Sequence, residues 1–479
     1  MKQIIADVGV FETRAAVLDN GIVEELHFER KNNRSLVNNI YCGSIVNIVR
    51  GLGTVFIDIG THKNVFLHES EINKPLTMLK EGDRILVQIT KDALGSKGAK
   101  ATTFLSLPGK YIVFLPNDNH IGISNRITDA TERSKLEEIA NRLTEGTSHG
   151  IIMRTESLNQ PGELIESDFQ YMQMIWNQID AGWRTADKGE LLFREEALLP
   201  RLLRDVMDRK TAVFILNDSK EASKIRDLCQ RVMPDYCSRI TESDQGENLF
   251  EEYDIEMQWK HAMKNKIPLK SGGSVIFNHT EALTTIDVNT GKFTGKKAFE
   301  ETVLQINLEA VDTITRQLRL RDIGGIIIID FIDMKSFRHN SMLLNKLKQE
   351  LNKDRQKTVV LGMTKLGLVE MTRRKTRKKV ESLFNEPCPN CDGTGWVPSI
   401  YRHVYELENK FRKLETHRDI DRVVVSINPE RWTELKDEGI SLEELAEAYG
   451  LEIELIKDAS ITRDNFDIKL HLKRNRPVK

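Results

Sequence analysis

Two aspartates end short apolar runs, and their positions could support metal chemistry. Asp287 ends LTTID and Asp330 ends GIIIID, while Asn289 lies two residues beyond Asp287. Carboxylate oxygens are the ligands that hard divalent cations such as magnesium prefer. Two carboxylates held close together repel each other unless a cation lies between them. Asn289 could then hold a carboxylate or a metal-bound water in place.

The segments around these residues predict how the aspartates could meet. Both runs are short and apolar, which is typical of strands buried on both faces of a sheet. Between them, residues 298–320 carry apolar side chains at helical spacing. A strand, a helix and a second strand predict two parallel strands joined by a crossover. Both aspartates would then lie at the carboxyl ends of neighbouring strands, where open α/β sheets place their ligands.

A purely structural role is the alternative, because aspartate often ends a strand or caps a helix. Asp333 fits that alternative, since a helical pattern over 337–351 follows it. Local spacing alone leaves both interpretations of Asp287 and Asp330 open.

Cys388 and Cys391 are spaced as half of a zinc site. A structural zinc takes four ligands, and the chain has no second pair of this kind. His403 is a candidate extra ligand, although it opens a predicted helix, and a redox pair is a further alternative. A zinc site shared by two chains would complete the ligand count. The remaining cysteines lie in predicted strands or helices and are expected to be buried thiols: Cys42, Cys229 and Cys237.

Composition indicates a soluble, multidomain protein of 479 residues, with 39% hydrophobic and 30% charged residues. No apolar run approaches the ~20 residues that span a bilayer, and the first residues lack a secretory signal. We therefore expect a cytoplasmic location. Five cysteines imply no disulfide framework. The net charge is −2, and basic residues gather locally in 372–379 and 469–479, where they could contact phosphates or only form a solvated face.

Three segments resemble the catalytic core of the ribonuclease E/ribonuclease G family: TTIDVNTG, NLEAVDTITRQLRLRDIGGIIIIDFIDM and LGLVEMTRRKTR. The resemblance extends over essentially the whole chain and is closest to the ribonuclease G type, because no long disordered tail follows. It implies that Asp287 and Asp330 hold one catalytic Mg²⁺ per chain, supported by Asn289. The implied activity is endonucleolytic cleavage of single-stranded, A/U-rich RNA that leaves 5′-phosphate and 3′-hydroxyl ends. Ribosomal RNA processing and mRNA decay are the implied roles.

The resemblance also implies a multidomain α/β and α+β architecture. A ribonuclease H-like domain carries an inserted OB-fold barrel and 5′-sensor domain, and a DNase I-like catalytic domain follows. The expected boundaries are 1–35 and 200–264 for the ribonuclease H-like parts, 36–105 for the barrel, 106–199 for the sensor, 265–384 for the catalytic domain, 385–397 for the zinc-link and 398–479 for a small α+β domain.

Residues of the barrel and sensor are expected to bind RNA. Phe56 and Phe66 match surface aromatics on which bases stack, and Lys97 matches a basic residue of the same surface. A core position is the alternative for both phenylalanines. In the sensor, the resemblance implies that a 5′-monophosphate is bound by the residues at Gly109, Val113, Arg154, Thr155 and Lys357.

Two of these phosphate contacts are in question from the sequence alone. Lys357 stands where the family usually has arginine, so it keeps the charge and loses the bidentate fork. Arg154 could instead pair only with a nearby acid such as Glu156 or Glu163.

The resemblance implies that two chains share one Zn²⁺ through Cys388 and Cys391, which forms the principal homodimer, and that pairs of dimers form homotetramers. A non-catalytic RNA-binding or ribosome-assembly protein is the main alternative, and the intact aspartates argue against it. A weaker alternative is an actin-like ATPase, which rests on a loose match around Asp7.

Overall fold

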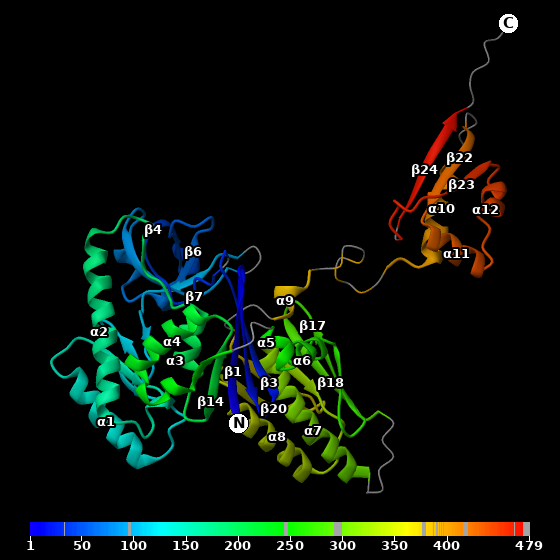
Figure 1. Ribbon diagram of the computed structural model, residues 1–479. Helices are drawn as coiled ribbons and strands as arrows, with labels where there is room; N and C mark the ends of the chain where they lie inside the picture. The colour runs from blue at the N-terminus through cyan, green and yellow to red at the C-terminus, as the bar shows by residue number, and fades with distance from the viewer. Residues whose placement is uncertain are drawn as a thin grey trace. The chain divides into compact units, whose positions relative to one another are not determined.

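The computed structural model of the chain forms two compact units, Met1–Leu383 and Phe384–Lys479 (Figure 1). It describes residues 1–32, 34–93, 97–243, 248–291, 299–375, 380–386, 388, 391, 393, 395, 397–414, 420–463 and 465–472. The expected basic runs extend into 376–379 and 473–479, which lie outside the described residues. No helix among the described residues is long and apolar enough to cross a membrane.

The first sheet of the large unit joins two distant parts of the chain. Its order is β15 (Ile240–Glu242), β14 (Thr211–Leu216), β1 (Lys2–Val8), β2 (Glu12–Asp19) and β3 (Ile22–Arg30). Asn20 and Gly21, a residue pair typical of two-residue hairpin turns, connect β2 to β3, and both have positive φ. Helices α3 (Leu198–Asp205) and α4 (Ser219–Val232) bury one face of this sheet. Short helices α5 (Leu249–Glu252) and α6 (Ile255–Ala262) bury the other.

Five strands form the predicted small barrel, which is closed and OB-like. In order around the barrel they are β4 (Ile40–Val49), β5 (Thr54–Asp58), β6 (Val65–His68), β8 (Lys100–Thr102) and β7 (Arg84–Lys91), and β7 pairs back with β4. Alternate side chains of these strands fill its interior.

The sequence pattern of residues 167–207 predicts two long helices, and this prediction is wrong. One long helix, α2 (Gly162–Thr185), is followed by β13 (Leu191–Phe193), which pairs with β4 at the barrel. Only the short α3 comes after it. Strand pairing with a distant segment overrides the local helical preference of this stretch.

A smaller sheet follows the barrel in the sequence and precedes β14 and β15 of the first sheet. Its strands are β11 (Ile121–Ile123), β12 (Gly150–Met153), β10 (Ile112–Leu115) and β9 (Leu107–Pro108). Helix α2 and α1 (Ala130–Thr144) share its core. Asp129 caps α1 by accepting a hydrogen bond from the Glu132 N–H.

The last sheet of the large unit has the order β16 (Lys266–Pro268), β17 (Ser274–His279), β18 (Leu283–Asn289), β19 (Gly325–Asp330), β21 (Val369–Arg373) and β20 (Thr358–Met363). Strands β18 and β19 are parallel and joined by α7 (Phe299–Leu320), which confirms the predicted crossover. Helix α8 (Phe337–Leu351) lies beside α7 (Figure 1), and both contribute to the core of this sheet.

The expectation that β18 and β19 are buried on both faces is wrong. Ile327 and Ile329 of β19 are fully buried, whereas Ile326 of the same strand is 51% exposed, although β19 lies between β18 and β21 in the sheet. Both helices pack on the same face, so the other face of the sheet is open. The polar residues at the carboxyl ends of β18 and β19, namely Asp287, Asn289 and Asp330, belong to this open face.

The small unit has the expected α+β composition. Its sheet has the order β23 (Ile453–Lys457), β22 (Ile420–Ile427) and β24 (Phe466–Leu472). Helices α10 (Ile400–Leu414), α11 (Pro429–Asp437) and α12 (Leu442–Ala448) pack on it. A short helix, α9 (Glu381–Phe384), lies where the two units meet in the sequence.

Candidate active site

Asp287 and Asp330 lie directly opposite each other at the carboxyl ends of β18 and β19. Asp287 alternates with the buried Ile286 and Val288, and Asp330 follows the buried Ile329, so both carboxylates belong to the open face of the sheet. The juxtaposition predicted from the apolar runs is therefore confirmed. The open face leaves the carboxylates accessible to a substrate.

Asn289 lies on the same face and holds one of the carboxylates. Its Nδ2 donates a hydrogen bond of 2.7 Å to Oδ2 of Asp287. This bond fixes the orientation of the Asp287 carboxylate and leaves its other oxygen available. The supporting position expected for Asn289 matches this geometry.

Asp333 is a third carboxylate near the pair. Burial raises the pKa of the Asp330 carboxyl, and the negative charges of Asp287 and Asp333 raise it further. The alternative that Asp333 caps the following helix is wrong, because the Ser336 side chain caps α8 by accepting from the His339 N–H. Asp333 instead lies in the loop after β19, where a Cβ on Gly367 would approach its Oδ1 to 3.2 Å.

This donor set fits magnesium. Carboxylate oxygens predominate, and burial together with the neighbouring charges of Asp287 and Asp333 raises the pKa of Asp330. Among the described residues, no group of three or more His, Cys, Asp or Glu side chains is placed to hold a metal ion. A pair of carboxylates is nevertheless sufficient for magnesium, which commonly keeps several waters and binds substrate phosphates at its remaining positions.

Asn307 is a buried polar residue that the sequence analysis missed. It is fully buried in α7, where its Nδ2 donates to the Ile332 carbonyl at 2.8 Å and its Oδ1 accepts from the Ile332 N–H at 3.1 Å. These two bonds hold the loop that follows Asp330. Its signal in the sequence is a polar residue within the apolar stripe of a helix, next to Ile306 and one turn from Val303 and Ala310.

The barrel carries the predicted aromatic pair on its surface. Phe56 and Phe66 lie opposite each other on β5 and β6, both half-buried, with ring centroids 6.3 Å apart. Their strand neighbours Val55, Ile57, Val65 and Leu67 fill the barrel core, so the alternative of a core position is wrong. The exposed Lys97 precedes Ala99, whose carbonyl accepts the Phe66 N–H at 2.8 Å. The three residues therefore share one region of the barrel.

Arg154 follows β12 and contacts the loop that contains Gly109. Its Nη1 donates to the Gly109 carbonyl, and its Nη2 forms an ion pair of 2.7 Å with Asp205. The proposed pairing with Glu156 or Glu163 is replaced by this pair. Although burial opposes it, the guanidinium groups of Arg204 and Arg154 hold the pKa of Asp205 well below its usual range.

Asp168 of α2 explains the glycine at position 109. Its carboxylate accepts backbone N–H bonds from Lys110, Tyr111 and Ile112, at 3.1, 2.7 and 3.2 Å. A Cβ on Gly109 would lie 2.4 Å from Asp168 Oδ2, so a larger residue would displace the carboxylate. The Gly109 loop is therefore held in one conformation beside Arg154.

The other predicted phosphate-binding residues lie around the same strands. Val113 on β10 pairs with Ile152 of β12, close in sequence to Arg154. The Thr155 Oγ1 is 3.0 Å from the Ser124 Oγ, which follows β11. Gly109, Val113, Arg154 and Thr155 thus gather at one end of this small sheet.

Lys357 lies in the loop between α8 and β20, where its carbonyl accepts the Arg374 N–H at 2.9 Å and its side chain is exposed. The structure links this loop to the small sheet through Arg126, whose Nη2 donates to the Asp354 carbonyl. Arg126 carries no signal in the sequence, because only a nonlocal contact distinguishes it from other surface arginines. The Asp354 carboxylate is itself fixed by the buried Arg373 at 2.7 Å.

Cys388 is exposed and Cys391 is half-buried. The Gly395 N–H donates a hydrogen bond of 3.3 Å to the Cys391 Sγ. His403 is buried in α10, with its ring packed edge-on against Phe466. Of the other three cysteines, Cys42 and Cys229 are buried as expected, and Cys237 is half-buried.

Comparisons with known proteins all indicate one family. A family model described as the ribonuclease E/G family matches residues 106–376. The chain is 34% identical to Ribonuclease G of Salmonella typhimurium (strain SL1344), with 97% of this chain and 99% of that protein covered. Against Ribonuclease G of Haemophilus influenzae the identity is 33%, over 89% and 90%. Ribonuclease E of the same organism is 33% identical over 81% of this chain and 43% of its own length.

Proposed function

This chain belongs to the ribonuclease E/G family, and we propose that it is a magnesium-dependent endoribonuclease acting on single-stranded, A/U-rich RNA. The observation that carries the proposal is the placement of Asp287 opposite Asp330 on the open face of the β18–β19 pair. The products are RNA ends with a 5′-phosphate and a 3′-hydroxyl. Ribosomal RNA processing and mRNA decay are the roles that follow.

Asp287 and Asp330 hold one magnesium ion, which supplies activation of water and stabilisation of charge on the scissile phosphate. Asn289 keeps the Asp287 carboxylate in a fixed orientation, so little reorganisation is needed when the substrate arrives. Asn307 fixes the loop beyond Asp330 from the opposite, buried side of the sheet. The open face provides room for single-stranded RNA to lie across the carboxyl ends of β18 and β19.

The remaining parts of the large unit bind the substrate away from the cleavage point. The first sheet is a ribonuclease H-like domain, the small sheet with α1 is a 5′-sensor, and the six-stranded sheet with α7 and α8 is a DNase I-like catalytic domain. Phe56 and Phe66 offer stacking surfaces for bases, and Lys97 offers a cation for phosphate. Gly109, Val113, Arg154, Thr155 and Lys357 recognise a 5′-monophosphate, which stimulates cleavage.

The direct test of the proposed function is incubation of the purified chain with an end-labelled single-stranded RNA. Cleavage should require magnesium and stop on addition of a chelator, and the new 5′ end should be a substrate for a 5′-monophosphate-dependent exonuclease. RNA binding without cleavage at any magnesium concentration would instead favour a non-catalytic RNA-binding protein.

Arg154→Ala should reduce cleavage of 5′-monophosphorylated RNA by about tenfold or more, because a charge-assisted hydrogen bond contributes roughly 1.5–3 kcal/mol. Cleavage of the same RNA with a 5′-hydroxyl should change much less. The comparison of the two rates, with a melting curve of each variant, measures the sensor contribution separately from stability.

Asp205→Asn is the matched control, because it weakens the Arg154 ion pair and keeps the guanidinium. It should lower the melting temperature and preserve the preference for a monophosphate. If Arg154→Ala slows both RNAs equally, Arg154 serves only to hold the domain together. Lys357→Ala in the same assay shows whether lysine contributes at this position.

Cys388 and Cys391 bind one zinc ion together with the same pair of a second chain, so the chain forms a homodimer that can pair into a tetramer. Metal analysis should then give about half a zinc per chain, since four thiolates serve two chains. Replacing both cysteines with serine should release the metal and shift the dimer toward monomer in analytical ultracentrifugation. A full zinc per chain would contradict the shared site.

A further inference from the structure

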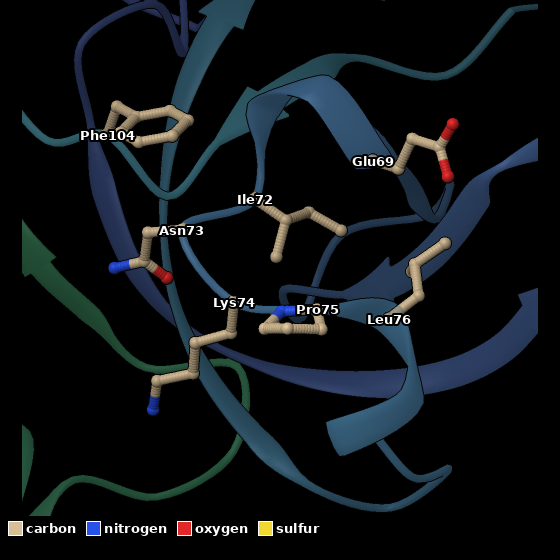
Figure 2. Close-up of a pocket in the computed structure, with 7 residues that line it drawn as sticks. All are labelled: Glu69, Ile72, Asn73, Lys74, Pro75, Leu76 and Phe104. Atoms are coloured by element: carbon tan, nitrogen blue, oxygen red, sulfur yellow. The ribbon is translucent and has the colours of Figure 1, made fainter.

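The barrel carries an open groove that Phe56, Phe66 and Lys97 do not line. It has a volume of about 530 Å³ and is lined by Glu69, Ile72, Asn73, Lys74, Pro75, Leu76 and Phe104. Figure 2 shows the ring of Phe104 on one side of the groove and Pro75 and Leu76 on the other, with Ile72 between them. We propose that this groove is a second base-binding subsite for the single-stranded RNA substrate, in which Phe104 stacks on a nucleobase. The proposal rests on the proposed function of the chain in RNA cleavage.

The structure forces Phe104 outward. Its neighbours Thr103 and Leu105 are 8% and 6% exposed, whereas Phe104 is 50% exposed. The Phe104 N–H donates to the Thr102 Oγ1 at 3.1 Å, which fixes the backbone at this point. Half-exposed aromatic rings of this kind serve as stacking platforms for the bases of single-stranded nucleic acid.

The two sides of the groove are joined before any ligand arrives. The Thr103 N–H donates to the Glu71 carbonyl at 2.9 Å, and the Asn73 N–H donates to the Thr103 Oγ1 at 2.8 Å. The Thr103 hydroxyl also donates to the Glu71 carbonyl at 3.1 Å. Because these bonds fix Phe104 relative to 72–76, a base would bind without a large cost of ordering the protein.

Side chains of both charges lie around the groove. Lys74 is exposed at the side of the groove, and Lys100 lies nearby with its Nζ 2.9 Å from Glu71 Oε1. Glu69 is the one acidic residue in the lining, and its carboxylate lies against Gly53, where a Cβ would be only 2.7 Å from its Cδ. In Figure 2 the Glu69 side chain points away from Phe104. The groove therefore combines a half-exposed aromatic ring, Phe104, with an exposed cation, Lys74.

Strand pairing connects the groove to the aromatic pair. Phe66 pairs with Lys100, and Phe104 follows Lys100 by four residues. Four residues span at most about 14 Å, which is short enough for one RNA strand to reach both places, since an OB fold contacts about 4–16 nucleotides. We therefore expect the groove to contribute to the binding of RNA longer than the segment held by Phe56 and Phe66.

The test measures the affinity of the full chain for fluorescein-labelled 5′-hydroxyl RNA, in chelator to prevent cleavage. Phe104→Ala should weaken binding of a 16-nucleotide RNA by at least about fivefold, as expected for loss of one base stack. Phe104→Tyr should bind within twofold of the unchanged chain. A 5-nucleotide RNA should be affected less than the longer one. The matched control is Phe11→Leu, which changes a phenylalanine that is 77% exposed at the turn between β1 and β2.

A direct contact is tested with 16-nucleotide RNA containing 4-thiouridine. Irradiation should cross-link it to a peptide that contains Phe104 or residues 72–76. If Phe104→Ala leaves the affinity unchanged while Phe66→Ala weakens it, the groove is not an RNA subsite and the barrel remains an RNA-binding domain. If neither variant changes the affinity, the proposed role of the barrel in RNA binding fails as well. Equal weakening by Phe104→Ala and Phe11→Leu would also overturn the subsite.

Discussion

Replacing Asp287 or Asp330 with asparagine should reduce RNA cleavage by several orders of magnitude and leave RNA affinity largely unchanged. Asparagine has nearly the same shape as aspartate and lacks the charge that a divalent cation requires. Loss of one ligand should therefore remove the activation of water and the stabilisation of the phosphate that the metal supplies. Single-turnover cleavage of a labelled RNA over a series of magnesium concentrations measures the effect.

The melting temperature of the same variants separates a functional role from a structural one. Burial and the charges of Asp287 and Asp333 raise the pKa of Asp330, so the three carboxylates destabilise one another in the absence of a cation. Asp330→Asn should therefore melt at the same or a higher temperature in chelator. A lower melting temperature together with near-normal cleavage under limiting magnesium would mean that the aspartates only cap their strands.

The position of these two carboxylates was predictable because local patterns determine it. A short apolar run, an amphipathic helix and a second apolar run specify a parallel crossover, and the handedness and connection rules then bring Asp287 and Asp330 together. The barrel was predictable for a similar reason, since short strands at regular spacing with turns between them have few ways to pair.

Features that depend on nonlocal packing were not predictable. The four consecutive isoleucines of β19 show no alternation, so the sequence gives no sign that Ile326 faces solvent and Ile327 faces α7 and α8. The partner of Arg154 is Asp205, about fifty positions away, and no local pattern could choose it over Glu156. The segment 191–193 forms a strand because it pairs with β4 of the barrel. Local helix propensity contains no information about such a distant partner.

The second large effect is expected at Asn307, a positioning residue that does not touch the substrate. Asn307→Leu removes both hydrogen bonds to Ile332 and leaves the N–H and the carbonyl of this partly buried residue without these partners. Each unsatisfied group costs about 1–3 kcal/mol, so the free energy of unfolding should fall. The loop that begins at Asp330 should also shift, and a displacement of about 1 Å near reacting groups can reduce the rate about a hundredfold.

Thr315→Val is the matched control for Asn307→Leu. Thr315 is buried in the same helix, 1% exposed, and its hydroxyl bonds only within the helix, to the Val311 carbonyl at 2.9 Å. Both variants should lose stability, but only Asn307→Leu should lower kcat while KM stays nearly constant. Asn307→Leu should also weaken the binding of Mn²⁺, because the Asp330 carboxylate is no longer held in place. Binding is measured from the electron paramagnetic resonance signal of free Mn²⁺, which decreases as the ion binds to the protein. A variant that loses stability yet keeps its kcat and its affinity for Mn²⁺ would show that the Asn307 bonds serve the fold alone.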